Sequence, residues 1–383
     1  MRICLVYDCL FPHTVGGAER WYRNLAEHMV EEGHEVTYLT LRQWERGRSA
    51  EIDERVRVRI AGPRMALYTG GRRRILPPLV FGAGVFWHLL RHGRRYDVVH
   101  TASFPYFSLL AAGATRKLGR FDLVVDWHEV WSGEYWREYL GPLGGRIGRA
   151  VQMLCARIPQ RAFCFSRLHA GRLSQEGLRG GVTVLEGEYA GPLQTPTPQI
   201  ADPVVVFAGR LIPEKRALLG VAGVAAAAKR LPGLRGIFFG DGPQREAVLA
   251  AIAEHGAQET ITAPGFVDSQ QVDAALRKSL CMLLPSSREG YGMIVVEACA
   301  QATPAVVVAA ADNAAVELVC EGVNGTIVPS ADPEMIAQAI VRVHEAGMAL
   351  RESTAQWFAQ NSQRLSLESS LRVVLDSYAS ARP

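Results

Sequence analysis

Short apolar runs alternate with amphipathic stretches along the chain, a pattern that predicts an α/β protein. The apolar run at residues 3–7 predicts a buried strand, and apolar positions three and four apart at 18–32 predict a helix. A second strand is predicted at 36–41, so the chain begins with a βαβ unit, the building block of helix-covered parallel sheets. Further elements of the first half are expected at 96–100, 103–118, 123–126 and 162–166.

Residues 186–203 interrupt this alternation. The stretch contains four Pro and no apolar period, which is typical of a linker between domains. We therefore predict two doubly wound, Rossmann-like α/β domains, an N-terminal one at 1–188 and a C-terminal one at 189–365. Strands of the second domain are expected at 204–208, 236–239, 260–262, 280–284 and 305–308, and helices at 216–230, 244–255, 269–278, 293–301 and 333–345.

Composition agrees with two soluble domains and adds an asymmetry of charge. The 383 residues are 48% hydrophobic and 21% charged, which excludes a largely disordered chain. Residues 1–190 hold 27 Lys and Arg against 19 Asp and Glu, whereas residues 191–383 hold 15 against 19. The basic half is expected to face an anionic group or a membrane surface. A total of +4 is too small to indicate a nucleic acid partner.

The sequence also bears on compartment. Its longest apolar stretch, residues 75–90, includes two Pro and is shorter than the roughly 20 residues of a spanning helix. The N-terminus lacks the pattern of a signal peptide. The seven Cys are dispersed without a Cys-x-x-Cys pair, which predicts neither a disulfide framework nor a zinc site. We expect a cytoplasmic protein.

Two carboxylates mark a glycine-rich loop in the second half. Glu289 lies after the strand at 280–284, and Glu297 lies about one turn into the next helix. Carboxylates beside a helix N-terminus need hydrogen-bond donors, and the hydroxyls of a sugar and a ribose would supply them. From the spacing alone, an exposed loop with a solvated helical Glu is the better explanation.

Two other loops carry groups suited to phosphate. Arg210 and Lys215 follow the strand at 204–208, where both can contact a diphosphate, although two exposed surface charges explain them equally well. Gly16 and Gly17 separate the first strand from the first helix, where backbone amides can approach a phosphate or form a simple tight turn. No Gly-x-Gly-x-x-Gly or Walker motif occurs.

A His and several aromatic residues follow the strand at 123–126. His128 stands between Asp126 and Glu129 and is a candidate for hydrogen bonding or proton transfer, although any single His is more commonly structural. Trp127 and Trp131 could stack on a sugar ring, and packing in the core is the alternative.

In this order and spacing, the motifs resemble glycosyltransferase family 4, retaining nucleotide-sugar-dependent enzymes of the GT-B fold. The resemblance covers nearly the whole chain. It implies two Rossmann-like domains that face a central cleft, with the helix at 366–383 packed back on the first domain. It also implies a nucleotide-diphosphate sugar as co-substrate, no cofactor and no metal, which agrees with the lack of an Asp-x-Asp motif.

The resemblance assigns site residues position by position. His128 matches the active-site His, Arg210 and Lys215 match the pair that neutralises the diphosphate, and Glu289 matches the Glu that binds sugar hydroxyls. Further donor-binding positions are Gly16, Gly17, Gly209, Val267, Gly290, Tyr291, Gly292, Met293 and Glu297. Two differences lie near the donor site: Ala302 replaces a usual Gly, and Asn313-Ala314 replaces a usual pair of Gly.

We therefore predict a retaining bacterial glycosyltransferase that acts on a hydroxyl of a small-molecule, saccharide or lipid-linked acceptor, in natural-product or cell-envelope biosynthesis. A nucleotide-sugar epimerase of the same fold and a non-catalytic nucleotide-sugar-binding protein are the alternatives. Predicted acceptor contacts are Trp127, Trp131, Arg72 and Arg73.

Residues 64–95, in which Arg clusters flank the apolar stretch, have three interpretations. They form a peripheral contact with anionic lipid at the inner face of the plasma membrane, a wall of the acceptor cleft, or a helix packed on the sheet with charged ends.

Overall fold

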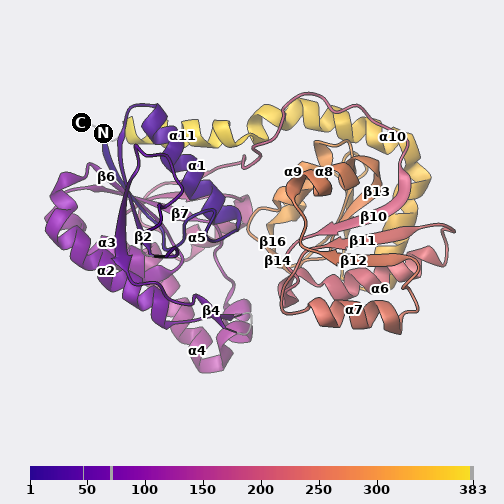
Figure 1. Ribbon diagram of the computed structural model, residues 1–383, viewed down its shortest axis with the longest axis horizontal. Helices are drawn as coiled ribbons and strands as arrows, with labels where there is room; N and C mark the ends of the chain where they lie inside the picture. The colour runs from indigo at the N-terminus through magenta and orange to yellow at the C-terminus, as the bar shows by residue number, and fades with distance from the viewer. Residues whose placement is uncertain (46, 70–71, 380–383) are drawn as a thin grey trace. The chain divides into compact units, whose positions relative to one another are not determined.

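The computed structural model describes residues 1–45, 47–69 and 72–379, with the backbone alone for Tyr68, Thr69, Arg72 and Arg73, and divides into two compact units (Figure 1). One unit comprises Met1–Leu185 and the C-terminal residues from Ser370, and the other is Glu186–Ser369. The division after Leu185 falls where the Pro-containing stretch begins. Each unit is a parallel sheet covered by helices, as the alternation of the sequence predicts.

The sheet of the first unit has seven parallel strands in the order β3-β2-β1-β6-β7-β8-β9. The strand order reverses beside β1, and the carboxyl ends of strands at such a switch point form the usual ligand site of a doubly wound sheet. The strands are β1 (Arg2–Val6), β2 (Glu35–Leu41), β3 (Arg57–Gly62), β6 (Val98–Ala102), β7 (Asp122–Trp127), β8 (Arg161–Cys164) and β9 (Val182–Val184), with a separate hairpin of β4 (Tyr68–Thr69) and β5 (Arg72–Arg73).

Helices cover both faces of this sheet. They are α1 (Gly17–Glu31), α2 (Leu76–His92), α3 (Tyr106–Gly119), α4 (Gly133–Ala156), α5 (Arg167–Gln175) and α11 (Leu367–Ala379), with a 3₁₀ turn η1 (Gly93–Arg95). Because successive strand residues face opposite sides, Val99 and Val125 share a core with α2–α5, whereas His100 and Asp126 face the other side, toward α1 and α11 (Figure 1).

The sheet of the second unit has six parallel strands in the order β12-β11-β10-β13-β15-β17. The strands are β10 (Asp202–Ala208), β11 (Arg235–Phe239), β12 (Ile261–Gly265), β13 (Ser279–Leu284), β15 (Ala305–Val308) and β17 (Gly325–Val328). Two short strands, β14 (Arg288–Glu289) and β16 (Asp312–Asn313), pair separately and set Glu289 opposite Asn313. The core of this unit includes Phe207 and Phe238, whose stacked rings lie 5.3 Å apart.

The helices of the second unit are α6 (Ala217–Ala228), α7 (Arg245–Glu254), α8 (Ser269–Lys278), α9 (Met293–Cys299) and α10 (Pro333–Leu365), with 3₁₀ turns η2 (Pro213–Lys215) and η3 (Ala314–Leu318). Asp332 begins α10 by accepting hydrogen bonds from Glu334 N and Met335 N. The predicted helix at 333–345 covers only the first part of α10, which kinks at Gly347 (φ +55°) and continues. The sequence analysis assigned no strand at β3 or β17 and no helix at α4 or α5.

No helix among the described residues is both long enough and apolar enough to cross a bilayer.

Candidate functional site

An ion pair joins two of the predicted site residues in the second unit. Lys215 Nζ lies 2.5 Å from Glu289 Oε1, and both side chains are largely buried. Lys215 ends the turn η2 after β10, and Glu289 lies in β14 after β13. Since β10 and β13 are neighbours in the parallel sheet, their carboxyl ends bring the two loops together. The tertiary fold therefore presents one cation and one carboxylate as a unit.

Further hydrogen bonds hold the loop that carries Glu289. Ser287 N donates to Glu214 O at 2.8 Å, which ties this loop to η2. The buried Asn313 donates from Nδ2 to Ser286 O (3.2 Å) and Val308 O (2.8 Å), and its Oδ1 accepts from Ala315 N. Asn313, noted in the sequence only as a departure from the family pattern, thus ties the backbone before β14 to the end of β15 and the start of η3.

Gly292 has a backbone that disfavours other residues. It precedes α9 with φ +102°, and a Cβ at this position would collide with Ala315. Only Gly lets the chain turn into α9 so close to η3. Gly290, Gly292 and Met293 therefore form a compact turn directly after Glu289, with backbone amides at a helix start.

The loop after β10 is also tied to the loop after β11. Leu211 N donates to Asp241 O at 2.9 Å, and Gln244 N donates to Leu211 O at 2.9 Å. Arg210 lies on this braced loop with an exposed side chain, directly after Gly209. A cation on a fixed loop at a strand end is suited to binding an anion.

The remaining predicted donor-binding residues differ in burial and in contacts. Tyr291 is buried and donates from its hydroxyl to Glu186 O at 2.7 Å, and burial raises the pKa of its phenol. Its side chain is therefore committed to the protein, which leaves only its backbone for a donor. Val267 follows β12 and Glu297 lies within α9, both half-buried.

In the first unit, Gly16 caps α1 and Gly17 begins it. Gln43 braces the loop before them: its Nε2 donates to Asp8 O (2.7 Å), and its Oε1 accepts from Leu10 N (2.9 Å) and Thr14 Oγ1 (2.8 Å). Gln43 follows β2, far from this loop in sequence, and no motif singled it out. The loop that carries the predicted phosphate-binding glycines is thus fixed by the neighbouring strand end.

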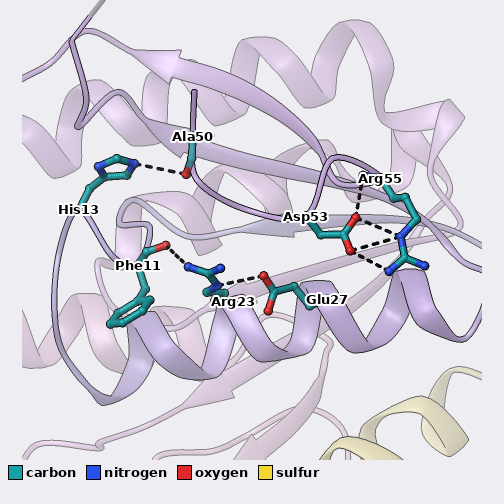
Figure 2. Close-up of polar contacts among 7 residues, drawn as sticks. All are labelled: Phe11, His13, Arg23, Glu27, Ala50, Asp53 and Arg55. Carbon is teal, nitrogen blue, oxygen red and sulfur yellow. Dashed lines mark hydrogen bonds and ion pairs between the residues drawn. The ribbon is translucent and has the colours of Figure 1, made fainter. Parts of the chain in front are cut away.

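Figure 2 shows further contacts around the same loop. Arg23 of α1 donates to Phe11 O and pairs with Glu27 at 2.9 Å, and the His13 ring lies 3.2 Å from Ala50 O. Close by, hydrogen bonds from the Arg55 side chain and backbone lower the pKa of Asp53 to about 2. Side-chain contacts therefore hold both loops, the one after β1 and the one after β2.

His128 lies directly after β7, at the carboxyl end of the sheet. Its ring stacks on Phe165 with centroids 4.4 Å apart and makes a T-shaped contact with Tyr22 of α1. Burial lowers the pKa of His128, although the charges of Asp126 and Glu129 act in the opposite direction. Its Nε2 is buried and has no hydrogen-bond partner among the described residues. A neutral imidazole with an available nitrogen can bind a hydroxyl group.

Close to His128, a series of linked polar side chains is buried. Asp126 Oδ1 lies 2.8 Å from His100 Nε2, and Asp126 Oδ2 accepts from Trp21 Nε1 at 2.7 Å. His100 Nδ1 lies 2.5 Å from the Tyr378 hydroxyl of α11. Burial would raise the pKa of Asp126, but the nearby His100 and the hydrogen bonds outweigh it and lower that pKa. Polar residues within apolar strands were the one signal in the sequence for these buried contacts.

The predicted acceptor contacts are not supported as a group. Trp127 is fully buried in the core, where its Nε1 donates to Gln160 Oε1 at 2.9 Å. Trp131 is also buried and donates to Glu129 Oε2 at 2.7 Å. Packing in the core, the alternative reading of these aromatics, is therefore the one the structure favours. The side chains of Arg72 and Arg73 lie outside the described part of the chain.

Comparison with known proteins identifies the class. Residues 15–185 match the family model described as "Glycosyltransferase Family 4", and residues 197–363 match the one described as "Glycosyl transferases group 1". The chain belongs to the family 4 glycosyltransferases, and its two Rossmann-like units are those of the GT-B fold.

Curated relatives are similar over part of their length. A 2-deoxystreptamine glucosyltransferase of Streptomyces kanamyceticus is 35% identical over 107 residues, which cover 28% of this chain and 28% of the relative. An alpha-D-kanosaminyltransferase of the same organism is 26% identical over 154 residues, or 40% of this chain and 39% of the relative. The matches thus span less than half of these two proteins.

Solved structures are similar over the whole chain. A sucrose-phosphate synthase of Thermosynechococcus elongatus has a TM-score of 0.78 at 17% identity and covers 99% of this chain and 98% of its own. Anabaena HepE, in complex with UDP and glucose, has a TM-score of 0.72 at 20% identity and covers 99% and 100%. At such identities the likeness concerns the fold.

Proposed function

We propose that this protein transfers a sugar from a nucleotide-diphosphate sugar to a hydroxyl of an acceptor, with retention of the anomeric configuration. The observation that carries the proposal is the contact of Lys215 with Glu289, near the exposed Arg210, at the carboxyl ends of β10 and β13. Relatives named as glycosyltransferases and a structural neighbour that binds UDP and glucose support it.

The two cations are assigned to the leaving group. When the bond between the sugar C1 and the diphosphate oxygen breaks, its electron pair stays on the diphosphate. Arg210 and Lys215 stabilise that charge by charge-assisted hydrogen bonds, a role that other enzymes give to a metal ion. We propose that the transfer proceeds without a metal.

The carboxylate and the imidazole are assigned to the sugar. Glu289 accepts hydrogen bonds from hydroxyls of the donor sugar, and the neutral His128 binds a further hydroxyl beside C1. The acceptor oxygen forms its bond to C1 on the face that the diphosphate leaves, and the acceptor proton passes to a departing phosphate oxygen. Donor configuration is thereby retained without a covalent intermediate on the protein.

The acceptor is a hydroxyl-bearing small molecule, a saccharide or a lipid-linked precursor. The name of one relative makes 2-deoxystreptamine a suitable first acceptor to assay. We also propose that the protein is cytoplasmic and that residues 64–95 make a peripheral contact with the membrane.

Thermal unfolding with UDP-, GDP-, ADP- and dTDP-sugars tests donor binding first. The expected result is stabilisation by sugars of one nucleotide. Release of nucleoside diphosphate that depends on an acceptor, with the product anomer determined by NMR, then tests transfer and retention. Conversion of the nucleotide sugar into its epimer, without release that depends on an acceptor, indicates an epimerase, and binding without turnover indicates a non-catalytic protein. No stabilisation by any of the four contradicts the proposal.

A further inference from the structure

The helix layer formed by α2, α3 and α4 has an unusual outer surface. These helices cover one face of the first sheet, with α3 packed against both neighbours, and their inner residues join one hydrophobic core (Figure 1). On a helix that covers a sheet, the outward positions are normally polar. Here two of the three helices carry several large apolar side chains at outward positions.

On α2, large apolar side chains follow the outward side over its whole length. Leu76, Leu79, Trp87 and Leu90 are all exposed, and Trp87 is exposed over 53% of its surface. At 100° per residue, these four positions fall within one narrow stripe. The opposite side, with Phe81, Val85 and Leu89, is buried in the core. The helix therefore has apolar residues on both sides, and one side has no cover among the described residues.

The same arrangement occurs on α4 after its break at Gly141. Leu143 and Ile147 are exposed over 75% and 67% of their surfaces, and Leu154 continues the stripe two turns later. Gln152 and Cys155 of the opposite side are buried. Single exposed apolar side chains are common on protein surfaces. Exposed apolar side chains at helical spacing on two helices of one layer form a larger apolar patch than such single residues do.

The charge of this layer is mainly positive. Its three helices hold two acidic residues, Glu134 and Glu138, both exposed in the part of α4 before the break at Gly141. Residues 75–96, 98–121 and 139–157 contain no Asp or Glu. Basic residues in these stretches include Arg91, Arg94, Arg95, Lys117 and Arg146, all exposed. Arg91 lies 5.0 Å from the ring centre of Trp87, so a cation accompanies the largest exposed aromatic ring.

We propose that the outer surface of α2–α4 binds the surface of an anionic phospholipid bilayer. The apolar stripes of α2 and α4 enter the boundary between headgroups and acyl chains, and the Arg and Lys side chains contact lipid phosphates. Trp87 beside Arg91 suits that boundary, where amphipathic rings concentrate. The inference rests on the membrane contact proposed above for residues 64–95 and extends it to α3 and α4. It is tested without a donor or acceptor, so its failure leaves the proposed sugar transfer unaffected.

Charge argues against a second copy of the chain as the occupant. A symmetric dimer through this surface would bring two faces of net positive charge together, which is repulsive. A bilayer that contains anionic lipid supplies both the apolar phase and the opposite charge.

Flotation of the full-length protein with vesicles tests the proposal. Vesicles of phosphatidylglycerol and phosphatidylcholine in a one-to-three ratio are compared with phosphatidylcholine alone. The expected result is flotation with the anionic vesicles only, weakened by salt because the lipid contact is partly electrostatic. Absence of binding by the folded protein would overturn the proposal.

Substitutions identify the surface. The double variant Leu143→Ser and Ile147→Ser, and separately Arg91→Gln with Arg94→Gln, are expected to weaken vesicle binding at least tenfold. Ile200→Ser is the matched control, since Ile200 is 88% exposed but lies in the second unit. Thermal unfolding verifies that each variant folds. Equal vesicle binding by all variants contradicts the assignment of this surface. A protein that forms a dimer, does not bind vesicles and loses the dimer in the Leu143→Ser and Ile147→Ser double variant contradicts it as well.

Discussion

Lys215 Nζ and Glu289 Oε1 lie 2.5 Å apart, although the two residues are 74 positions apart in the chain. The contact joins the cation assigned to the diphosphate with the carboxylate assigned to the sugar. Loss of either side chain leaves the other charge without this partner in a largely buried position. We therefore expect binding of the two ends of the donor to be coupled through this ion pair.

Substitution of this pair should abolish most activity. Lys215→Met and Glu289→Gln are each expected to lower kcat/KM about 10²–10³-fold, a typical loss when a group that stabilises transition-state charge is removed. The double variant should lose little more than either single variant, since the residues act as a unit. Steady-state kinetics with the preferred donor measure this. Lys229→Met, at an exposed position after α6, is the control and should keep full activity.

His128 should control the response to acid. Because burial lowers the pKa of His128, although Asp126 and Glu129 oppose the shift, acid protonates this imidazole at a lower pH than it protonates a free histidine. If the neutral ring binds a substrate hydroxyl, the acid limb of kcat/KM should lie below the pH at which a free histidine titrates. His128→Gln should reduce kcat and remove the acid limb that this residue causes. His344→Gln, on the exposed side of α10, should leave the profile unchanged.

The buried chain of Asp126, His100 and Tyr378 should hold α11 in place. Asp126→Asn removes the charge opposite His100, and loss of one partner of a buried pair costs about 3 kcal/mol of unfolding free energy. Tyr378→Phe removes one hydrogen bond, which costs about 1 kcal/mol. Hydrogen exchange should show faster exchange in α11 for both variants. Val373→Ala, at an exposed position of α11, should show the same hydrogen exchange as the wild type. Equal exchange rates in all three variants would contradict a role of these buried contacts in holding α11.

Ala302 is a position where Gly should increase stability. Its φ of +56° lies in the left-handed region, where a Cβ costs about 1–2 kcal/mol, and the residue is fully buried. After the entropic cost of Gly is subtracted, Ala302→Gly should raise the unfolding free energy by about 0.5–1 kcal/mol. Chemical denaturation, monitored through the unfolding of the second unit, measures the change in unfolding free energy. Ala298→Gly, buried in the regular part of α9, should lower it.

Local sequence predicted the α/β class and most of the strands of each unit. The runs at 3–7 and 204–208 became β1 and β10 because a parallel strand buried on both faces needs a continuous apolar stretch. Gly16 and Gly292 were recognisable because each stands where a strand end turns into a helix. Arg210, Lys215 and Glu289 became candidates because polar residues after parallel strands gather at one edge of the sheet, and the resemblance to family 4 then gave them their predicted roles.

Only the tertiary structure decided which of these groups touch. Spacing along the chain does not report that β10 and β13 are neighbours, so it could not pair Lys215 with Glu289. Nor could it join His100 to Tyr378, whose contact depends on where α11 packs. Trp127 and Trp87 make the same point: two apolar residues in similar surroundings in the sequence, one in the core and one exposed. The burial of a side chain depends on how the helices and strands pack against one another, and the order of residues along the chain does not specify that packing directly.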